Sequence, residues 1–418
     1  MDAPDTISPD RPKLPFPWEA VVVGLLGTLI ALGLVGWVLL SEPATSPEPP
    51  ATRRLGYPHQ GASREHFVGN DACSECHPSE TAFHARHGHS RTLRPAEDRL
   101  LAQQLVNRRV KDPEQPGVFW TYHLEKDGLH VERDDGFQVD RVPLEYAFGS
   151  GYHATTFVSM LDPDADLPHA LEHRLTYFAD TDTIGITPGQ KQESYLEHRD
   201  ILGRFLERIE AWQCFSCHVT MPSGDDLDSL DVTTMIPNIT CERCHGPGKE
   251  HVEQARRGAH PDELAMPFGP GRWTVESQLQ LCGACHRHPD QTPAGYKIEP
   301  ENNLLARFQP VGMMQSACFT KSDGALSCVT CHDPHARPSK DHAFYESICL
   351  SCHQAEPSSP QVACPVSPRN GCVDCHMPPV NAGQGVLYSD HWIRVRDDIS
   401  RSSHQMEKLS GDSTQVLE

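Results

Sequence analysis

The sequence has few of the side chains that fill an ordinary protein core. Across 418 residues, hydrophobic residues make up 38% and aromatic residues 7%. These fractions are low for a globular chain whose length allows two or three domains. We therefore expect material other than aliphatic side chains, such as a buried cofactor, to fill part of the interior.

Basic residues are also scarce. The chain has 36 Lys and Arg against 57 Asp and Glu, which gives a formal net charge of -21. Binding to nucleic acid relies on clustered Lys and Arg that neutralise phosphates. This balance argues against a nucleic-acid partner, and the acidic surface otherwise serves solubility or the steering of charged partners.

Long hydrophobic runs are absent except for one. Residues Ala20 to Leu40 contain no charge and are long enough to cross a bilayer as a helix, with Trp18 and Trp37 near the two ends. The alternative is a cleaved signal peptide, whose apolar core is shorter and ends at small residues. Since Ser41-Glu42-Pro43 is a poor cleavage site, we expect an uncleaved membrane anchor.

Cysteine is abundant and arranged in a repeated motif. Seven segments read Cys-x-x-Cys-His, with the cysteine pairs Cys73/Cys76, Cys214/Cys217, Cys241/Cys244, Cys282/Cys285, Cys328/Cys331, Cys349/Cys352 and Cys372/Cys375. The histidines that follow are His77, His218, His245, His286, His332, His353 and His376. Two thiols at this spacing lie on one side of a helical turn, where they can form thioethers with the two vinyl groups of a haem. The next histidine then binds the iron as its proximal ligand.

Zinc sites and redox dithiols also use Cys-x-x-Cys pairs, but neither needs a histidine directly after the pair. Here no Cys-x-x-Cys lacks that histidine. Zinc sites also tend to combine two pairs, and seven pairs leave one over. The sequence therefore predicts seven covalently attached haem c groups. Because haem attachment takes place outside the cytoplasm, we expect the folded part in the periplasm or an equivalent compartment.

Two of the 16 cysteines lie outside the motifs, Cys318 and Cys364. In an oxidising compartment an even remainder indicates a disulfide bond, and two separate free thiols are the alternative. The other surplus is histidine, because 18 of the 25 are not proximal. Electron carriers use such histidines to fill the second axial position of each iron, whereas an enzyme leaves one position open.

Local phrases around the motifs resemble multihaem cytochromes c, a group that includes the tetrahaem carrier of ammonia oxidation and, more distantly, hydroxylamine oxidoreductase. The phrases are CHPSETAFHARHGHSRTL, CERCHGPGKEHV, LSCVTCHDPH, CLSCH and GCVDCHMP followed by DHWIRV. The resemblance covers most of residues 66 to 396. It implies that His89, His251, His335 and His391 are distal ligands to haems other than their nearest neighbours. His153, in a glycine-flanked turn, is a fifth candidate, and for each of the five a surface or hydrogen-bonding role is the alternative.

The remaining distal ligands stay open among His66, His84, His87, His169, His173, His198, His288 and His342. The sequence also lacks the Cys-x-x-Cys-Lys motif of pentahaem nitrite reductases, and no tyrosine can be assigned the haem cross-link of hydroxylamine oxidoreductase. Both absences favour a carrier over an enzyme.

The region from 115 to 192 has no cysteine and reads as β-rich, with a hairpin signal at Phe119 to Leu124, a turn at 126 to 128, and a second strand at Leu129 to Val131. A helical stretch, AEDRLLAQQLVNRRV, precedes it. We expect a mainly α-helical or irregular multihaem cytochrome c with a β-rich insert, preceded by one N-terminal transmembrane helix. The expected segments are a cytoplasmic tail (1–19), the anchor (20–40), a Pro-rich linker (41–62), a first haem segment (63–110), the β-rich insert (111–204), a six-haem domain (205–396) and a polar tail (397–418).

The expected function is electron transport between redox partners, with a quinol-oxidising complex in the membrane as one possible donor. The second hypothesis is an oxidoreductase acting on a small nitrogen or sulfur compound at one open haem. A haem-bearing sensor is a third, but the short N-terminal tail contains no signalling domain.

Overall fold

The computed structural model describes residues 62–162, 168–190, 201–223, 229–264, 266, 268, 273–292, 297–353, 364–382 and 387–396. No helix in these ranges combines the length and the hydrophobicity needed to cross a membrane. The predicted cytoplasmic tail (1–19), anchor (20–40) and C-terminal tail (397–418) lie outside the described residues, as does the linker up to residue 61.

The first motif lies among short helices. They are η1 (Arg64–His66), α2 (Gly69–Ser74), α3 (Pro78–His84) and η2 (Gly88–Arg91). Pro78 begins α3 directly after His77, at the helix position where a missing N–H costs nothing. The buried Glu242 carboxylate accepts hydrogen bonds from the N–H groups of Val68 and Gly69, both at 2.9 Å. This contact ties the first motif to the third.

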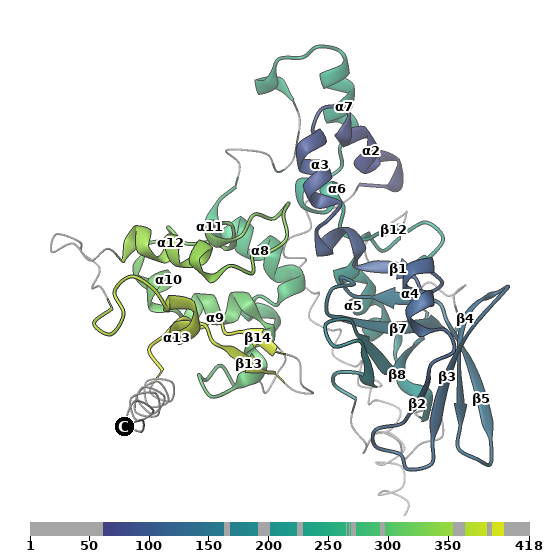
Figure 1. The fold of residues 1–418 in the computed structure, drawn as a ribbon. Coiled ribbons are helices and arrows are strands. Elements are labelled where there is room, and N and C mark those ends of the chain that lie inside the picture. The colour runs from purple at the N-terminus through teal and green to yellow at the C-terminus, as the bar shows by residue number, and fades with distance from the viewer. Residues whose placement is uncertain are drawn as a thin grey trace, which may run out of the picture. The chain divides into compact units, whose positions relative to one another are not determined.

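The strand-rich part begins at Leu93 and forms two antiparallel sheets (Figure 1). Its elements are β1 (Leu93–Pro95), α4 (Arg99–Leu105), β2 (Arg109–Lys111), β3 (Phe119–Glu125), β4 (Gly128–Asp134), β5 (Val139–Leu144), β6 (Tyr146–Phe148), β7 (Ala154–Met160), β8 (Ala170–Phe178), β9 (Thr183–Ile186) and β10 (Gly203–Leu206). One sheet has the order β1-β6-β7-β8-β10 with β9 also paired to β8, and the other has the order β2-β3-β4-β5. The predicted hairpin is confirmed, since β3 pairs with β4 and Tyr122 lies opposite Val131.

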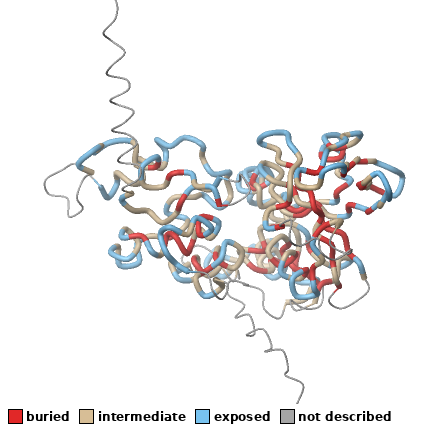
Figure 2. The backbone as a smooth tube through the Cα atoms, turned by 90° about the horizontal axis from the view of Figure 1, so that it is seen from below, coloured by how far each residue is buried: buried red, intermediate tan, exposed pale blue. Residues whose placement is uncertain are grey.

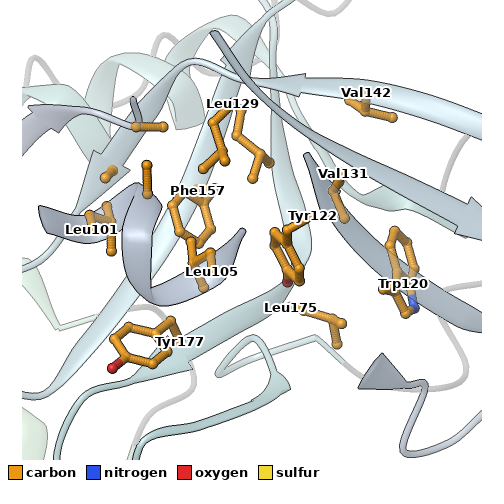
Figure 3. Close-up of a cluster of buried hydrophobic side chains, with 14 of the residues drawn as sticks. Leu101, Leu105, Trp120, Tyr122, Leu129, Val131, Val142, Phe157, Leu175 and Tyr177 are labelled. Carbon is orange, nitrogen blue, oxygen red and sulfur yellow. The ribbon is translucent and has the colours of Figure 1, made fainter. Parts of the chain in front are cut away.

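Alternation of polar and apolar residues explains how these sheets pack. Trp120 and Tyr122 on β3, and Leu129 and Val131 on β4, point to one buried face. They form a single core with Phe157, Leu175 and helix α4 (Figure 3). Inside this core the buried Arg174 guanidinium binds the Asp112 carboxylate, with Nη2 and Oδ1 2.8 Å apart, and the Trp120 indole donates to the same carboxylate at 3.0 Å.

The helix predicted from AEDRLLAQQLVNRRV is shorter than the stretch implies. Asp98 caps α4, because its side-chain oxygen accepts hydrogen bonds from the N–H groups of Leu100 and Leu101. Asp is a preferred residue at this position. The helix ends at Leu105, where Asn107 takes a positive φ of 65° and donates to the Tyr122 carbonyl. Pairing of residues 109–111 with β3 therefore overrides the local helical preference.

The other six motifs occupy short helices joined by turns. The elements are α5 (Arg208–His218), β11 (Val219–Met221), β12 (Ile236–Pro237), α6 (Cys241–His245), α7 (Lys249–Arg256), η5 (Pro261–Glu263), α8 (Val275–His286), η6 (Pro289–Gln291), η7 (Asn303–Arg307), α9 (Gln309–Gln315), α10 (Ala317–Lys321), α11 (Cys328–Cys331), α12 (His342–Cys352), α13 (Cys372–His376), β13 (Pro379–Asn381) and β14 (Leu387–Ser389). α8 packs against α9 and α11, and α12 packs against α11 and α13.

Buried residues gather in the strand-rich part, whereas the later helices have few (Figure 2). α12 contains Phe344 and Ile348 but has no buried residue, and the Phe344 side chain is 49% exposed. Side chains alone therefore supply little core here. The predicted porphyrins would provide the missing apolar contacts.

Candidate cofactor-binding site

Each motif is held on one helical turn. In the first, fifth and sixth motifs the histidine N–H donates to the carbonyl of the first cysteine, at 2.9 Å for His77, 3.0 Å for His332 and 2.9 Å for His353. In the other four the two cysteines and the histidine lie within one helix: α5, α6, α8 or α13. The local backbone thus presents both thiols and the imidazole together, as thioether attachment requires.

Four of the motif histidines face a second histidine from a distant part of the chain. The ring centres of His245 and His335 are 6.0 Å apart and the rings are nearly parallel, with an angle of 4°. The other pairs are His77 with His251 at 6.4 Å, His286 with His89 at 6.3 Å, and His332 with His391 at 6.3 Å.

These separations fit a metal ion between the two rings. Imidazoles that bind one ion from opposite sides, each through a bond of about 2 Å, have ring centres about 6 Å apart. Rings in direct contact lie closer, as His87 and His89 do at 4.2 Å. The four pairs therefore fit the two axial positions of haem iron.

Hydrogen bonds orient several of these rings. Nδ1 of His245 donates to the Phe268 carbonyl at 2.8 Å, and Nδ1 of His391 donates to the Ser389 carbonyl at 3.0 Å. Among the histidines without a paired ring, Nδ1 of His218 bonds the Thr92 carbonyl at 2.9 Å. With the proton on Nδ1, the Nε2 lone pair is left for the metal.

Burial favours the neutral form of several of these rings, and a metal ligand requires that form. It lowers the pKa of His391 to about 4. It lowers the pKa of His89 well below its ordinary value, with a further contribution from the neighbouring His87. The pKa values of His245 and His332 are also lowered, mainly by burial.

A cavity at the fifth motif has the size of a ligand site. Its volume is about 420 Å³, and it is lined by Val329, Thr330, Cys331, His332, Asp333, Pro334, His335, Phe344 and Ile348. One proximal and one predicted distal histidine border it together with two apolar side chains. A planar apolar group next to Cys331 suits this lining.

His153 differs from the other four predicted distal ligands. Its side chain is 70% exposed, and its Nδ1 lies 2.6 Å from Asp180 Oδ2. Within the part of the chain that the structure describes, it does not face a motif histidine. Gly149 is required by the close packing of the turn, because a Cβ at this position would come 2.2 Å from the Ala154 carbonyl oxygen.

Inside the described ranges, the structure shows no second histidine opposite His218 or His376. The His218 ring meets the edge of Phe148, with ring centres 5.0 Å apart, and His376 donates to the Arg394 carbonyl at 2.9 Å.

Of the unranked histidines, His84, His87, His173 and His288 are buried. His66, His169 and His342 bond Ser63, Asp162 and Asp374 respectively, and His198 lies outside the described residues. No local sequence signal distinguishes these roles, since the partners come from remote segments.

Neighbouring motifs touch through their thiols. The side chains of Cys73 and Cys241, of Cys217 and Cys285, and of Cys282 and Cys328 lie next to each other. The Arg243 guanidinium of the third motif also lies 3.8 Å from Cys285 Sγ of the fourth. The fourth motif therefore contacts the second, the third and the fifth.

Cys318 and Cys364, the predicted disulfide pair, are separate thiols in the structure. Burial raises the pKa of Cys318, with Cys352 of the sixth motif among the nearby thiols. The Cys364 thiol instead accepts a hydrogen bond from the Ser367 N–H at 3.4 Å, inside its own turn.

Comparison with known proteins agrees with these motifs. The sequence model of the family described as cytochrome c554 and c-prime matches residues 188–246, which hold the second and third motifs. This match and the seven motifs together support a multihaem c-type cytochrome with covalently bound haem c. The cysteine pairs of the motifs are the predicted attachment points.

Two solved structures are similar to this chain. One is the outer cell wall cytochrome OcwA, with 16% identity, a TM-score of 0.42, and coverage of 81% of this chain and 82% of that one. The other is the undecaheme cytochrome from the S-layer of Carboxydothermus ferrireducens, with 16% identity, a TM-score of 0.40, and coverage of 82% and 53%. A search of curated proteins gave no match.

Proposed function

We propose that this chain is a membrane-anchored, extracytoplasmic heptahaem cytochrome that carries electrons between redox partners. The observation that carries the proposal is the set of four opposed histidine pairs. A carrier gains from iron with both axial positions filled, because the ligands then stay the same in both oxidation states. When bound, each haem supplies a one-electron iron couple.

The contacts between motifs support a route along the chain of cofactors. The first motif contacts the third through Cys73 and Cys241, and the third contacts the fourth through Arg243. From the fourth, the Cys282–Cys328 contact leads to the fifth, and the packing of α12 on α11 and α13 leads to the sixth and seventh. The Cys217–Cys285 contact makes the second motif a branch.

Cysteines exposed to solvent in the first, sixth and seventh motifs support partner contacts at both ends of this route. Cys76 of the first motif is exposed, and so are Cys352 and Cys375 of the sixth and seventh. Electrons enter and leave a carrier where its cofactors approach the surface. A membrane donor, for example a quinol-oxidising complex, and an extracytoplasmic acceptor would dock at these two ends.

The second candidate function is an oxidoreductase that acts on a small nitrogen or sulfur compound at one open iron. What favours it is His218, whose side chain is partly buried and whose ring meets Phe148 in the structure. Such a site would lie on the branch, away from the ends of the route.

A carbon monoxide difference spectrum of the dithionite-reduced, detergent-solubilised protein separates the two functions. We expect no spectral shift if every iron has two tight ligands, and the carrier function then stands. A shift from one haem would favour the oxidoreductase. A pyridine haemochrome assay on the same sample tests the count, for which we expect seven haems per chain.

The anchor needs a separate measurement. Membranes from cells that express the full chain are washed with alkaline carbonate, and the pellet is probed together with the N-terminal sequence of the protein. Retention with residues 1–19 present supports the anchor. Release of a chain that begins after residue 40 would show a cleaved signal peptide instead.

A further inference from the structure

The turn from Gly149 to Tyr152 approaches the first haem segment closely. A Cβ on Gly88 would lie 2.8 Å from the Ser150 Cβ, so only glycine allows this approach. The Tyr152 hydroxyl donates to the Arg86 carbonyl at 2.9 Å, and the Gly149 N–H donates to the Thr92 carbonyl at 3.0 Å.

Three arginines from separate segments gather around this turn. The Arg337 guanidinium carbon lies 3.6 Å from the centre of the Tyr152 ring, and that of Arg91 lies 5.8 Å from it. The Arg94 guanidinium lies 3.3 to 3.7 Å from where a Cβ on Gly151 would be. Gly151, with a φ of +75°, therefore leaves the space that Arg94 occupies.

The three arginines differ in the charges around them. Within the described residues, no direct salt bridge joins Arg91, Arg94 or Arg337 to a carboxylate. The Arg94 Nε is buried and has no hydrogen-bond partner there. Burial lowers the pKa of Arg94, the nearby Asp98 carboxylate opposes this effect, and the charge of Arg91 adds to it.

One carboxylate acts on this group of arginines. Asp98 caps α4, and its charge also acts on Arg94. In a chain with 57 acidic residues and a net charge of -21, three arginines around one turn that form no direct salt bridge in the described residues are not expected from composition alone. An anion bound among them would reduce the repulsion between Arg91 and Arg94.

We propose that Arg91, Arg94 and Arg337, arranged around Tyr152 and Gly151, form a binding site for a carboxylate-like oxyanion. A guanidinium offers paired N–H donors that match two oxygens of such a group. The proposal does not depend on the direction of electron flow or on the partners of the carrier.

Two sources have this chemistry. One is a propionate of the haem at the second motif, because the Thr92 carbonyl that receives the Gly149 N–H also receives Nδ1 of His218. The other is a small inorganic oxyanion from solution. The site is partly open, since Arg91 and Arg337 are exposed and Arg94 is half-buried.

The experiment uses the full-length, haem-loaded protein in detergent and compares the wild type with Arg94→Gln, Arg337→Gln and the control Arg99→Gln. Arg99 is an exposed arginine at the start of α4, close in sequence to the site. The first arm titrates sodium sulfate, an oxyanion without redox activity here, by calorimetry in low-salt buffer. The second arm measures the reduction potentials of the haems by spectroelectrochemistry.

If the oxyanion comes from solution, the wild type binds sulfate, and each site variant binds it about ten- to hundredfold more weakly, as expected for one charged hydrogen-bonded pair. If it is the propionate, the wild type binds no sulfate, but the potential of one haem falls in both site variants because a positive charge is lost. In either case Arg99→Gln behaves as the wild type.

The proposal is overturned if neither sulfate affinity nor any haem potential differs between the site variants and the control. Arg337 is exposed, so its substitution leaves the fold intact and keeps this outcome informative even if Arg94→Gln folds poorly. Sulfate binding that is equal in all four proteins would place the anion elsewhere and overturn the proposal as well.

Discussion

Replacing His335 by alanine tests the axial pairs directly. The His335 ring lies opposite His245 at 6.0 Å with an angle of 4° between the rings, and its Nδ1 lies 3.2 Å from Asp333 Oδ1. Alanine removes the ring while His245 and its two cysteines keep their attachment. The iron at the third motif would then have one protein ligand instead of two.

The size of the effect follows from the count of motifs. With seven irons per chain and one opened, the reduced variant should bind carbon monoxide at about one-seventh of its haem. A double variant with His251→Ala should reach about two-sevenths, because the first and third irons are separate sites. The His335 side chain is 40% exposed, so the free energy of unfolding should change mainly through the loss of the iron ligand.

The assay is the carbon monoxide difference spectrum, normalised to total haem, with electron paramagnetic resonance of the oxidised protein for a new high-spin signal. His153→Ala is the matched control, since His153 also stood among the predicted ligands but bonds Asp180 at the surface. It should leave both spectra unchanged. An unaltered spectrum for His335→Ala, or a new high-spin signal for His153→Ala, would refute the assignment of axial pairs from ring separation.

Four further predictions concern the fold around the haem segments. Arg174→Met leaves the buried Asp112 carboxylate without its charged partner and should lower the free energy of unfolding, measured with urea, by about 3–5 kcal/mol. An unchanged urea midpoint would contradict this prediction. Burial alone would raise the pKa of Asp112, but hydrogen bonds from Arg174 and Trp120 outweigh this effect and lower the pKa. The charged Asp112 carboxylate therefore stabilises the folded state at neutral pH, and this contribution should be lost as the pH falls below about 4. The melting temperature should fall over the same pH range. Thiol titration of the denatured, unreduced protein should find two reactive thiols, Cys318 and Cys364, because the other 14 cysteines are thioethers; a count of zero would restore the disulfide. Gly149→Ala places a Cβ against the Ala154 carbonyl at a φ of +126° and should destabilise the strand-rich part by at least about 1–3 kcal/mol, whereas Gly136→Ala, with open space around it, serves as the comparison for positive φ alone.

The parts of this protein that sequence predicts well are those set by local chemistry. Motif spacing predicts the attachment residues, and alternation determines the hairpin, where Trp120 and Tyr122 fall on one face together with Leu129 and Val131. Both signals act over a few residues. Neither depends on the tertiary contacts that the rest of the chain makes.

The axial pairs show where that reasoning stops. His251 and His335 were named as ligands through resemblance, but the sequence could not state which motif each one faces. His251 lies opposite His77 of the first motif, and His335 lies opposite His245 of the third. These pairings depend on tertiary contacts such as the carboxylate of Glu242 on the backbone of α2, and no local pattern encodes them.

The strand-rich insert does more than supply a core. Tyr146 and Phe148 on β6 pack edge-on against Phe215 of α5, and Phe148 also meets His218. The Thr92 carbonyl, just before β1, orients the His218 ring. The second motif thus has its histidine held by the sheet, whereas the sixth motif on α12 has no buried residue around it. Since burial and hydrogen bonding to the axial ligand tune the potential of a haem iron, the insert sets the second motif apart from the surface-exposed ends of the route.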